Sequence, residues 1–350
     1  MNSLIDLAVH AERDYRVRGV EDWRSELTTI VDSGRTLIIA PKKFSGSWGL
    51  SSLISPSVQL YETPDGEEQK EFLQLQQLWD ACAKARLGRT DRIVAIGGGA
   101  TTDLGGFVAA TWLRGISWIA IPTTLAGMVD AAIGGKTAIN SPSGKNLIGA
   151  FHSPSEVLID YSFLQTLPAR DIYAGLAEVI KVGFIQDEEI LAILERISTD
   201  QLIAVLPELI ERSIKVKSSV VSQDFKESRL REILNFGHTL GHAIERYENY
   251  SNRHGEAVAV GMLFALELSA ITMNLPRQIV EKAEKLLTKF QLPTRYSESA
   301  RDILLESLFL DKKTRGSHLR LIGLRSIHEP VWIEDPSLPT LQSAYERISS

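Results

Sequence analysis

Apolar residues in the first half of the chain fall into short runs separated by segments with helical spacing. The runs Arg35–Ala40, Ile93–Ile96 and Trp118–Ile121 are almost wholly apolar, as is typical of strands buried on both faces of a sheet. Two apolar runs within residues 4–20 flank a short polar segment and predict a β-hairpin. Strands that alternate with helices predict a doubly wound, Rossmann-like α/β domain with a parallel sheet.

The pattern changes near Leu167. From there to about Leu292, strand patterns almost vanish and long amphipathic helices follow one another. Pro168 can begin a helix, which places a domain boundary at this point. We therefore expect an α/β domain over residues 1–166. An all-α domain is expected over residues 167–350.

Composition narrows the class of protein. The 350 residues carry a formal net charge of -6, which argues against nucleic acid or an anionic membrane as the main partner. The N-terminus lacks a basic region followed by an apolar core, and no wholly apolar run approaches the roughly 20 residues that span a bilayer. One cysteine, Cys82, fits a reducing compartment. We expect a cytoplasmic protein that does not bind nucleic acid or membranes.

Glycines follow the strand that ends at Ile96. In Gly97–Gly99, backbone N–H groups at the start of a helix can face a phosphate, although a tight turn with close packing explains the same residues. Further along, Lys136 follows a glycine pair, and Lys145 and Asn146 follow another glycine. These residues suggest a phosphorylated ligand, and a solvated lysine loop is the alternative.

Three of the seven histidines lie close together in the second half. His238 and His242 are four residues apart, so a helix places both rings on one face, and His254 follows shortly after. Such histidines are either satisfied by neighbours or bind a metal ion. Glu178 and Lys181 could form an ordinary ion pair on the surface. Their neighbours in the sequence are apolar, however, which indicates burial, and a buried carboxylate needs a partner such as a metal ion.

Five long motifs carry a resemblance to a known family. They are IPTTLAGMVDAAIGGKTAIN, GKNLIGAFH, GLAEVIK, LNFGHTLGHAIE and HGEAVAVGM. From about Asp65 to about Arg320 the chain resembles the sugar-phosphate cyclases, and among them the 3-dehydroquinate synthases. The resemblance implies NAD and Zn²⁺ as cofactors, with Co²⁺ possible, and a small sugar phosphate as substrate. It implies that residues 1–166 form an NAD-binding domain and that residues 167–350 bind metal and substrate, with the active site between the two domains. It also implies a homodimer.

The resemblance assigns roles to individual residues. The metal ligands would be Glu178, His238 and His254, which turns His242 toward the substrate phosphate. The contacts with NAD would come from Asp65, Glu67, Lys70, Gly98, Gly99, Asp103, Thr123, Thr124, Lys136, Lys145, Phe163 and Thr166. The contacts with the substrate would come from Asp130, Lys136, Asn146, Lys181, Lys217, Arg231, Asn235, His242 and Lys312 or Lys313. Arg114 resembles an arginine that reaches the partner subunit's site.

The implied reaction converts a seven-carbon keto-acid sugar phosphate to 3-dehydroquinate with loss of phosphate. One departure concerns the cofactor, because Pro41, Lys42 and Lys43 stand where the family often has an acidic residue for a ribose hydroxyl. These lysines raise the question of a 2′-phosphate. The alternatives are a sister cyclase such as an aminodehydroquinate synthase, a metal-dependent alcohol dehydrogenase of the glycerol-dehydrogenase type, and a non-catalytic nucleotide-binding module.

Overall fold

The chain forms two compact units. The computed structural model describes residues 4–315 and 318–350, without the side chains of residues 310–315. The first unit comprises Met1–Leu167 and Lys217–Lys226, and the second comprises Pro168–Val216 and Glu227–Ser350. The break at Leu167 lies one residue from the boundary expected from the sequence, but a short later segment also groups with the first unit.

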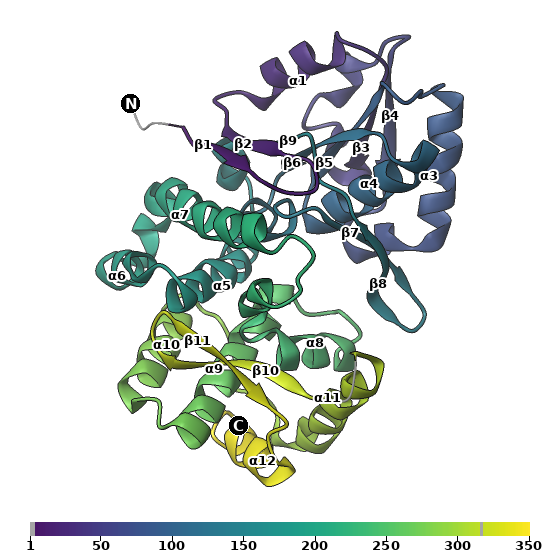
Figure 1. Cartoon of the computed structure of the whole chain (residues 1–350). Coiled ribbons are helices and arrows are strands. Elements are labelled where there is room, and N and C mark those ends of the chain that lie inside the picture. Colours follow the sequence, from purple (N-terminus) through teal and green to yellow (C-terminus); the bar gives the residue numbers. More distant parts are fainter. Residues whose placement is uncertain (1–3, 316–317) are drawn as a thin grey trace. The chain divides into compact units, whose positions relative to one another are not determined.

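The first unit is built on a seven-stranded sheet in the order β1-β2-β9-β6-β5-β3-β4 (Figure 1). Its strands are β1 Asp6–Val9, β2 Tyr15–Gly19, β3 Thr36–Pro41, β4 Val58–Thr63, β5 Arg92–Gly97, β6 Ser117–Pro122 and β9 Glu156–Ile159. The pair β1–β2 is antiparallel and the other neighbours are parallel. This confirms the predicted hairpin and the predicted parallel sheet, while β4 and β9 were missed.

Local sequence explains these elements. Every residue of β3 is buried, which accounts for its continuous apolar run. The Asp22 side chain accepts a hydrogen bond from the Arg24 N–H and begins the first helix. The helices of this unit are α1 Trp23–Val31, α2 Lys42–Ser45, α3 Phe72–Lys84 and α4 Gly99–Thr111, with short turns η1 Leu50–Leu53, η2 Gly66–Lys70, η3 Trp112–Arg114, η4 Gly127–Ala131 and η5 Tyr161–Gln165.

A separate hairpin carries the lysines of the second glycine-rich stretch. Strands β7 Lys136–Ser141 and β8 Gly144–Phe151 pair antiparallel, so the solvated loop considered from the sequence is not present there. Helix α4 contacts β5, β6 and β7. The glycine-rich start of α4 and this hairpin therefore belong to one packed region of the first unit.

The second unit is mainly helical, as expected, and also contains a hairpin that the sequence did not predict. Its helices are α5 Ala169–Ile185, α6 Glu188–Arg196, α7 Leu202–Gln223, α8 His238–Tyr247, α9 His254–Met273, α10 Arg277–Lys289, α11 Arg301–Arg315 and α12 Leu338–Glu346, with turns η6 Thr199–Gln201, η7 Leu230–Asn235 and η8 Glu298–Ala300. The last residues of α7 group with the first unit. The hairpin comprises β10 Arg320–Ser326 and β11 Glu329–Glu334.

Helix α9 is the centre of the second unit. It contacts α5, α8, α10, α12 and β10. Its length of 20 residues and mean hydropathy of 1.6 would allow it to cross a membrane by length and composition alone, although Glu256 and Glu267 interrupt its apolar run. Because 72% of its apolar window is buried inside the unit, these residues form the core of a folded domain.

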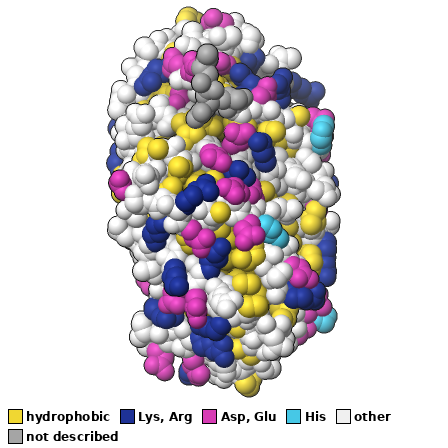
Figure 2. All heavy atoms as spheres, turned by 90° about the vertical axis from the view of Figure 1, so that its left-hand side faces the viewer, with side chains coloured by type: hydrophobic (Ala, Val, Ile, Leu, Met, Phe, Trp, Pro, Cys, Tyr) yellow, Lys and Arg dark blue, Asp and Glu magenta, His cyan; other side chains and the backbone are white. Residues whose placement is uncertain are grey.

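Charged side chains of both signs are interspersed on the face drawn in Figure 2. Among the ion pairs of the described residues are the partly buried pair of Arg212 with Asp187 and the more exposed pair of Lys215 with Glu211. The Lys215 side chain is half exposed, and its ammonium lies 2.6 Å from the Glu211 carboxylate. Exposed pairs stabilise a protein by about 1 kcal/mol or less each, so they contribute little to the stability of the fold.

Candidate active site

Glu178, His238 and His254 meet in the second unit, from three different helices. Glu178 lies within α5, whereas His238 and His254 are the first residues of α8 and α9. The Glu178 Oε1 atom lies 3.5 Å from His238 Nε2 and 3.4 Å from His254 Nε2. Ligands about 2.0–2.1 Å from a tetrahedral metal are separated from one another by roughly 3.3 Å, so this spacing fits a metal ion.

The electrostatics of this cluster also suit a cation. Burial and the nearby Lys181 ammonium hold the pKa of His238 well below its usual range, so its ring is neutral and can act as a ligand. Burial opposes charge on His254, but hydrogen bonds with Glu178 and Glu245 raise its pKa to about 10. The carboxylates that would stabilise an imidazolium equally stabilise a metal ion. Two imidazoles and one carboxylate suit Zn²⁺ or Co²⁺.

His242 belongs to a second, overlapping group with Glu245 and His254. Its ring lies 5.4 Å from that of His238 and 6.0 Å from that of His254, and it is exposed. His254 faces Glu245 through Nδ1 at 3.0 Å, a hydrogen-bond distance. The group containing Glu178, in which His254 offers Nε2, is therefore the better candidate for a metal site.

A buried lysine organises a polar cluster in the first unit. The Lys70 ammonium donates to Asp103 Oδ2 at 2.6 Å and to the Asn146 side chain, and lies 3.7 Å from Glu67. Lys145 lies 3.4 Å from the other oxygen of Glu67. Burial raises the pKa of Asp103, and the Lys70 ammonium opposes this shift. Five predicted site residues are thus brought together beside the start of α4.

A second pair in the first unit joins Asp130 and Lys217. The Lys217 ammonium donates to the Asp130 carbonyl oxygen at 2.6 Å and to its carboxylate. Lys217 lies near the end of α7 and is almost fully buried, which fixes the direction of its side chain. The structure therefore presents one oriented ammonium next to one carboxylate, an arrangement that can hold an anion and handle a proton.

Comparison with known proteins identifies the family. The N-terminal model of 3-dehydroquinate synthase matches residues 60–174, and its C-terminal model matches residues 175–314. The chain belongs to the 3-dehydroquinate synthase family.

Individual relatives agree with this membership. A 3-dehydroquinate synthase of Streptomyces avermitilis is 51% identical over 82% of this chain and 80% of its own length. One of Corynebacterium diphtheriae is 44% identical over 98% of both chains. A solved 2-deoxy-scyllo-inosose synthase, complexed with carbaglucose-6-phosphate, NAD⁺ and Co²⁺, superposes with a TM-score of 0.85 at 26% identity and covers 98% of this chain and 100% of that one.

The remaining residues predicted to contact NAD lie in varied surroundings. Gly98 and Gly99 begin α4, and Thr124 accepts a hydrogen bond from the Gly127 N–H at 3.1 Å. Asp103 lies further along α4, and Thr123 is buried after β6. These positions follow the carboxyl ends of two neighbouring parallel strands, where α/β sheets bind ligands.

Three other residues predicted to contact NAD have side chains that contact other protein groups: Phe163, Thr166 and Asp65. The buried Phe163 ring stacks on Trp23 at 5.4 Å and meets Trp48 edge-on, so any contact it makes with a cofactor would come from its backbone. The Thr166 hydroxyl donates to the Phe163 carbonyl. Asp65 pairs with Lys43 at 3.3 Å, and both side chains are exposed. Lys43, considered for a 2′-phosphate, is thus next to a carboxylate.

The residues predicted to contact substrate fall in both units. Lys136 is exposed on β7, Arg231 is fully buried, and the Asn235 amide donates to Glu227 Oε1 at 2.9 Å. Arg114 is exposed at the end of η3 with a φ of 69°. Lys312 and Lys313 belong to α11, but their side chains lie outside the described residues.

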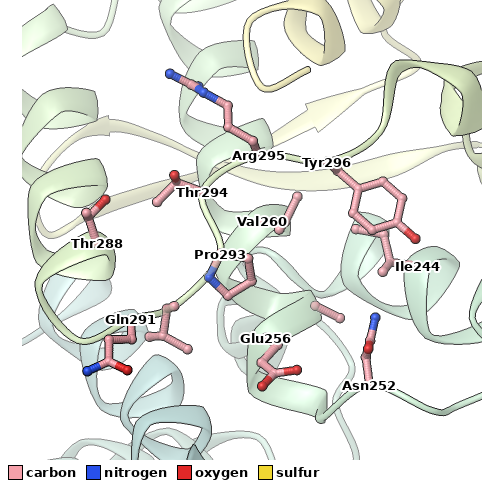
Figure 3. Close-up of a pocket in the computed structure, with 12 residues that line it drawn as sticks. Ile244, Asn252, Glu256, Val260, Thr288, Gln291, Pro293, Thr294, Arg295 and Tyr296 are labelled. Carbon is pink, nitrogen blue, oxygen red and sulfur yellow. The ribbon is translucent and has the colours of Figure 1, made fainter. Parts of the chain in front are cut away.

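None of these residues lines a cavity of about 600 Å³ in the second unit. Figure 3 shows Ile244 and Tyr296 on one side of it and Thr288 and Gln291 on the other. Its lining contains no ligand of the metal cluster and no predicted substrate contact. Converging donor atoms indicate a catalytic site better than empty volume alone, so the Glu178 cluster is the stronger candidate.

Two polar residues of these clusters were missed at the sequence level. Asn140 donates to Glu67 at 2.8 Å and accepts from the Asn146 backbone, and Glu245 contacts His254. Both stand inside quoted motifs, TAIN and LNFGHTLGHAIE, at spacings that suggest no particular chemistry. Only their position within those motifs could have indicated that Asn140 and Glu245 belong to the site.

Proposed function

We propose that this chain is an enzyme that converts 3-deoxy-D-arabino-heptulosonate 7-phosphate to 3-dehydroquinate and phosphate. The observation that carries the proposal is its identity of 44–51% to 3-dehydroquinate synthases, which in one relative extends over 98% of both chains. The reaction is a carbon–oxygen lyase step of the shikimate pathway, which leads to chorismate and the aromatic amino acids.

Glu178, His238 and His254 would hold the metal ion, Zn²⁺ or Co²⁺. When bound, such an ion polarises an alcohol or ketone oxygen and lowers the pKa of the alcohol. The residues around the start of α4 and the Lys70 cluster would hold NAD, which supplies a hydride acceptor that is restored within each turnover. The bound NAD⁺ and Co²⁺ of the similar inosose synthase support both assignments.

Three cations would bind the substrate's carboxylate and stabilise an adjacent enolate: Lys136, Lys217 and Arg231. Lys217 is oriented by Asp130, so its charge is fixed before substrate binds. The buried Arg231 guanidinium can pair bidentately with a carboxylate. This favours a carboxylated substrate over a neutral sugar. Loss of one such preorganised charge costs roughly 3–4 kcal/mol in the transition state.

The remaining residues would handle protons and phosphate. Lys181 and Asp130 are suited to exchange protons with substrate hydroxyls. Asn146, His242 and the Lys312–Lys313 pair would bind phosphate oxygens. During β-elimination, a C–H proton passes to a base, which the phosphate itself can provide, and the C–O bonding pair leaves with the phosphate. Ring opening and aldol closure then complete the carbocycle.

The wider organisation follows the same proposal. Residues 1–166 would form the NAD-binding domain and residues 167–350 the metal- and substrate-binding domain. We also propose a homodimer in which Arg114 completes the partner's site, and a cytoplasmic location, which the single free and buried Cys82 supports.

Phosphate release from two substrates tests the proposal. The protein, supplied with NAD and Zn²⁺, is given 3-deoxy-D-arabino-heptulosonate 7-phosphate or its amino variant. We expect a higher kcat/KM for the former. Preference for the amino variant would reassign the chain to an aminodehydroquinate synthase, and no phosphate release from either would refute a cyclase function.

A further inference from the structure

His254 contacts a different carboxylate through each ring nitrogen. Its Nε2 lies 3.4 Å from Glu178 Oε1, and its Nδ1 lies 3.0 Å from Glu245 Oε2. A neutral imidazole has one N–H and one lone pair. If Nδ1 donates to Glu245, the lone pair is on Nε2, facing Glu178 and His238.

We propose that Glu245 is a positioning residue for the metal centre. It holds His254 as the tautomer protonated on Nδ1 and turns Nε2 toward the metal position, without itself binding the ion. This rests on the proposed function only in assuming that Glu178, His238 and His254 bind a divalent cation. It does not depend on which reaction the enzyme catalyses.

The location of Glu245 suits this task. It lies on α8 seven residues after His238, which places both side chains on the same face of the helix. Its side chain is 3% exposed, so its carboxylate is directed into the packed contact between α8 and α9. Its carbonyl oxygen accepts the Tyr250 N–H at 2.8 Å, which fixes the turn at the end of α8. The carboxylate therefore has little freedom to move away from His254.

His238 is oriented in the same way, by a hydrogen bond from Nδ1, but its acceptor is a neutral carbonyl oxygen. Its Nδ1 lies 3.2 Å from the Phe236 carbonyl oxygen, leaving Nε2 to face Glu178. Both imidazoles are thus oriented through Nδ1, one by a neutral carbonyl and the other by a carboxylate. A carboxylate acceptor increases the basicity of the histidine that binds metal, so Glu245 should strengthen metal binding as well as direct it.

The contact distance separates this role from that of a ligand. Two atoms on one tetrahedral ion would be roughly 3.3 Å apart, whereas Glu245 and Nδ1 are 3.0 Å apart, a normal hydrogen bond. Use of the group containing His242, Glu245 and His254 would require this hydrogen bond to break. The structure keeps it, which favours positioning over ligation.

Zinc affinity of the full-length apo protein tests the proposal. Competition with a chromophoric chelator gives Kd for Zn²⁺ in the parent chain and in Glu245→Gln and Glu245→Ala. We expect binding to weaken about 10-fold in Glu245→Gln, whose amide oxygen still accepts, and up to about 100-fold in Glu245→Ala. Saturating Zn²⁺ should then restore turnover to Glu245→Gln.

Glu267→Gln is the matched control. Glu267 is also buried, with 3% exposure, and pairs with Arg277 and Arg347 away from the metal cluster. Its loss should reduce stability and leave Kd for Zn²⁺ unchanged. If Glu245→Ala does not fold, the Kd of Glu245→Gln for Zn²⁺ alone tests the proposal.

Two results would overturn the proposal. One is a Kd for Zn²⁺ within twofold of the parent value in every folded Glu245 variant. The other is a ¹H–¹⁵N histidine spectrum of the zinc-loaded parent in which the His254 proton is on Nε2. Because neither measurement uses substrate, normal zinc behaviour without phosphate release would refute the function and leave this inference intact.

Discussion

At the scale of single residues, the Glu178 carboxylate contacts the imidazoles of both His238 and His254. Oε1 of Glu178 faces both His238 and His254, the proposed metal ligands, while its Oε2 pairs with the buried Lys181 ammonium. Lys181 therefore limits how far the carboxylate can rotate. A metal ion at this position would lie among three side chains whose donor atoms are now 3.4–3.5 Å apart.

Metal content should separate ligands from substrate contacts. Glu178→Ala and His254→Ala should lose both bound metal and turnover, because each removes a donor from the three-residue cluster. His242→Ala should keep the metal and lose turnover, since His242 is exposed and its proposed partner is phosphate. Elemental analysis of the purified variants checks this. A metal-free His242→Ala protein would contradict the ligand assignment.

Lys70 should matter for stability more than an exposed lysine does. Its side chain is 2% exposed and that of Asp103 19%, so Lys70→Met leaves a mostly buried carboxylate without its cation. We expect a loss of about 3–5 kcal/mol in the free energy of unfolding, measured in urea. Lys43→Met, at an exposed pair, should cost about 1 kcal/mol or less. Equal losses in both variants would contradict this account.

The sequence predicts residue types at the site better than it predicts their partners. Helical spacing pairs His238 with His242, whereas the structure pairs His238 with His254 and Glu178 through three helices. That juxtaposition depends on tertiary packing, which spacing cannot reveal, and the family resemblance supplied it. Glu245 is one of 44 acidic residues, and only its burial against His254 distinguishes it.

At the scale of elements, α5 and α9 approach so closely that only glycine fits between them. A Cβ added to Gly255 would lie 1.7 Å from the Ala174 carbonyl oxygen. These two helices carry Glu178 and His254, so their separation sets the spacing of two proposed ligands. The close approach would thus link helix packing to metal binding.

Gly255→Ala should therefore separate the two helices and weaken zinc binding. We expect a lower unfolding temperature and a Kd for Zn²⁺ raised by at least about 10-fold, because a ligand is displaced while its chemistry is unchanged. Gly46→Ala is the control, since no atom lies within 4 Å of a Cβ at that position and its backbone is helical. Unchanged zinc affinity in Gly255→Ala would contradict this prediction, because it would show that Glu178 and His254 keep their spacing when the helices move.

Elements with a strong pattern could be predicted, and weakly patterned ones could not. The buried strands β3, β5 and β6 are continuous apolar runs. The hairpin β7–β8 was missed because glycine, lysine and asparagine interrupt its alternation. The length and hydropathy of α9 would suit a membrane as well as a protein core. Only its burial within the second unit shows that it is a core helix.

At the scale of the whole molecule, the proposed dimer predicts complementation between subunits. Arg114 is exposed, with left-handed backbone at both Leu113 and Arg114, as expected for a projecting tip. Arg114→Ala and Lys217→Ala should each be inactive. Mixed subunits should regain activity, because one site of each hybrid then has both residues. No recovery after subunit exchange, confirmed by mass spectrometry, would contradict a shared site.

The central claim is that NAD is reduced and reoxidised within each turnover. A dehydrogenase with a similar metal site would release a reduced cofactor, whereas the proposed elimination yields a product that takes the hydride back. The most direct measurement follows phosphate release and absorbance at the NADH band together, with NAD far below the substrate concentration. We predict many phosphates released per NAD with no steady rise in NADH. One NADH accumulated per substrate consumed would contradict the account.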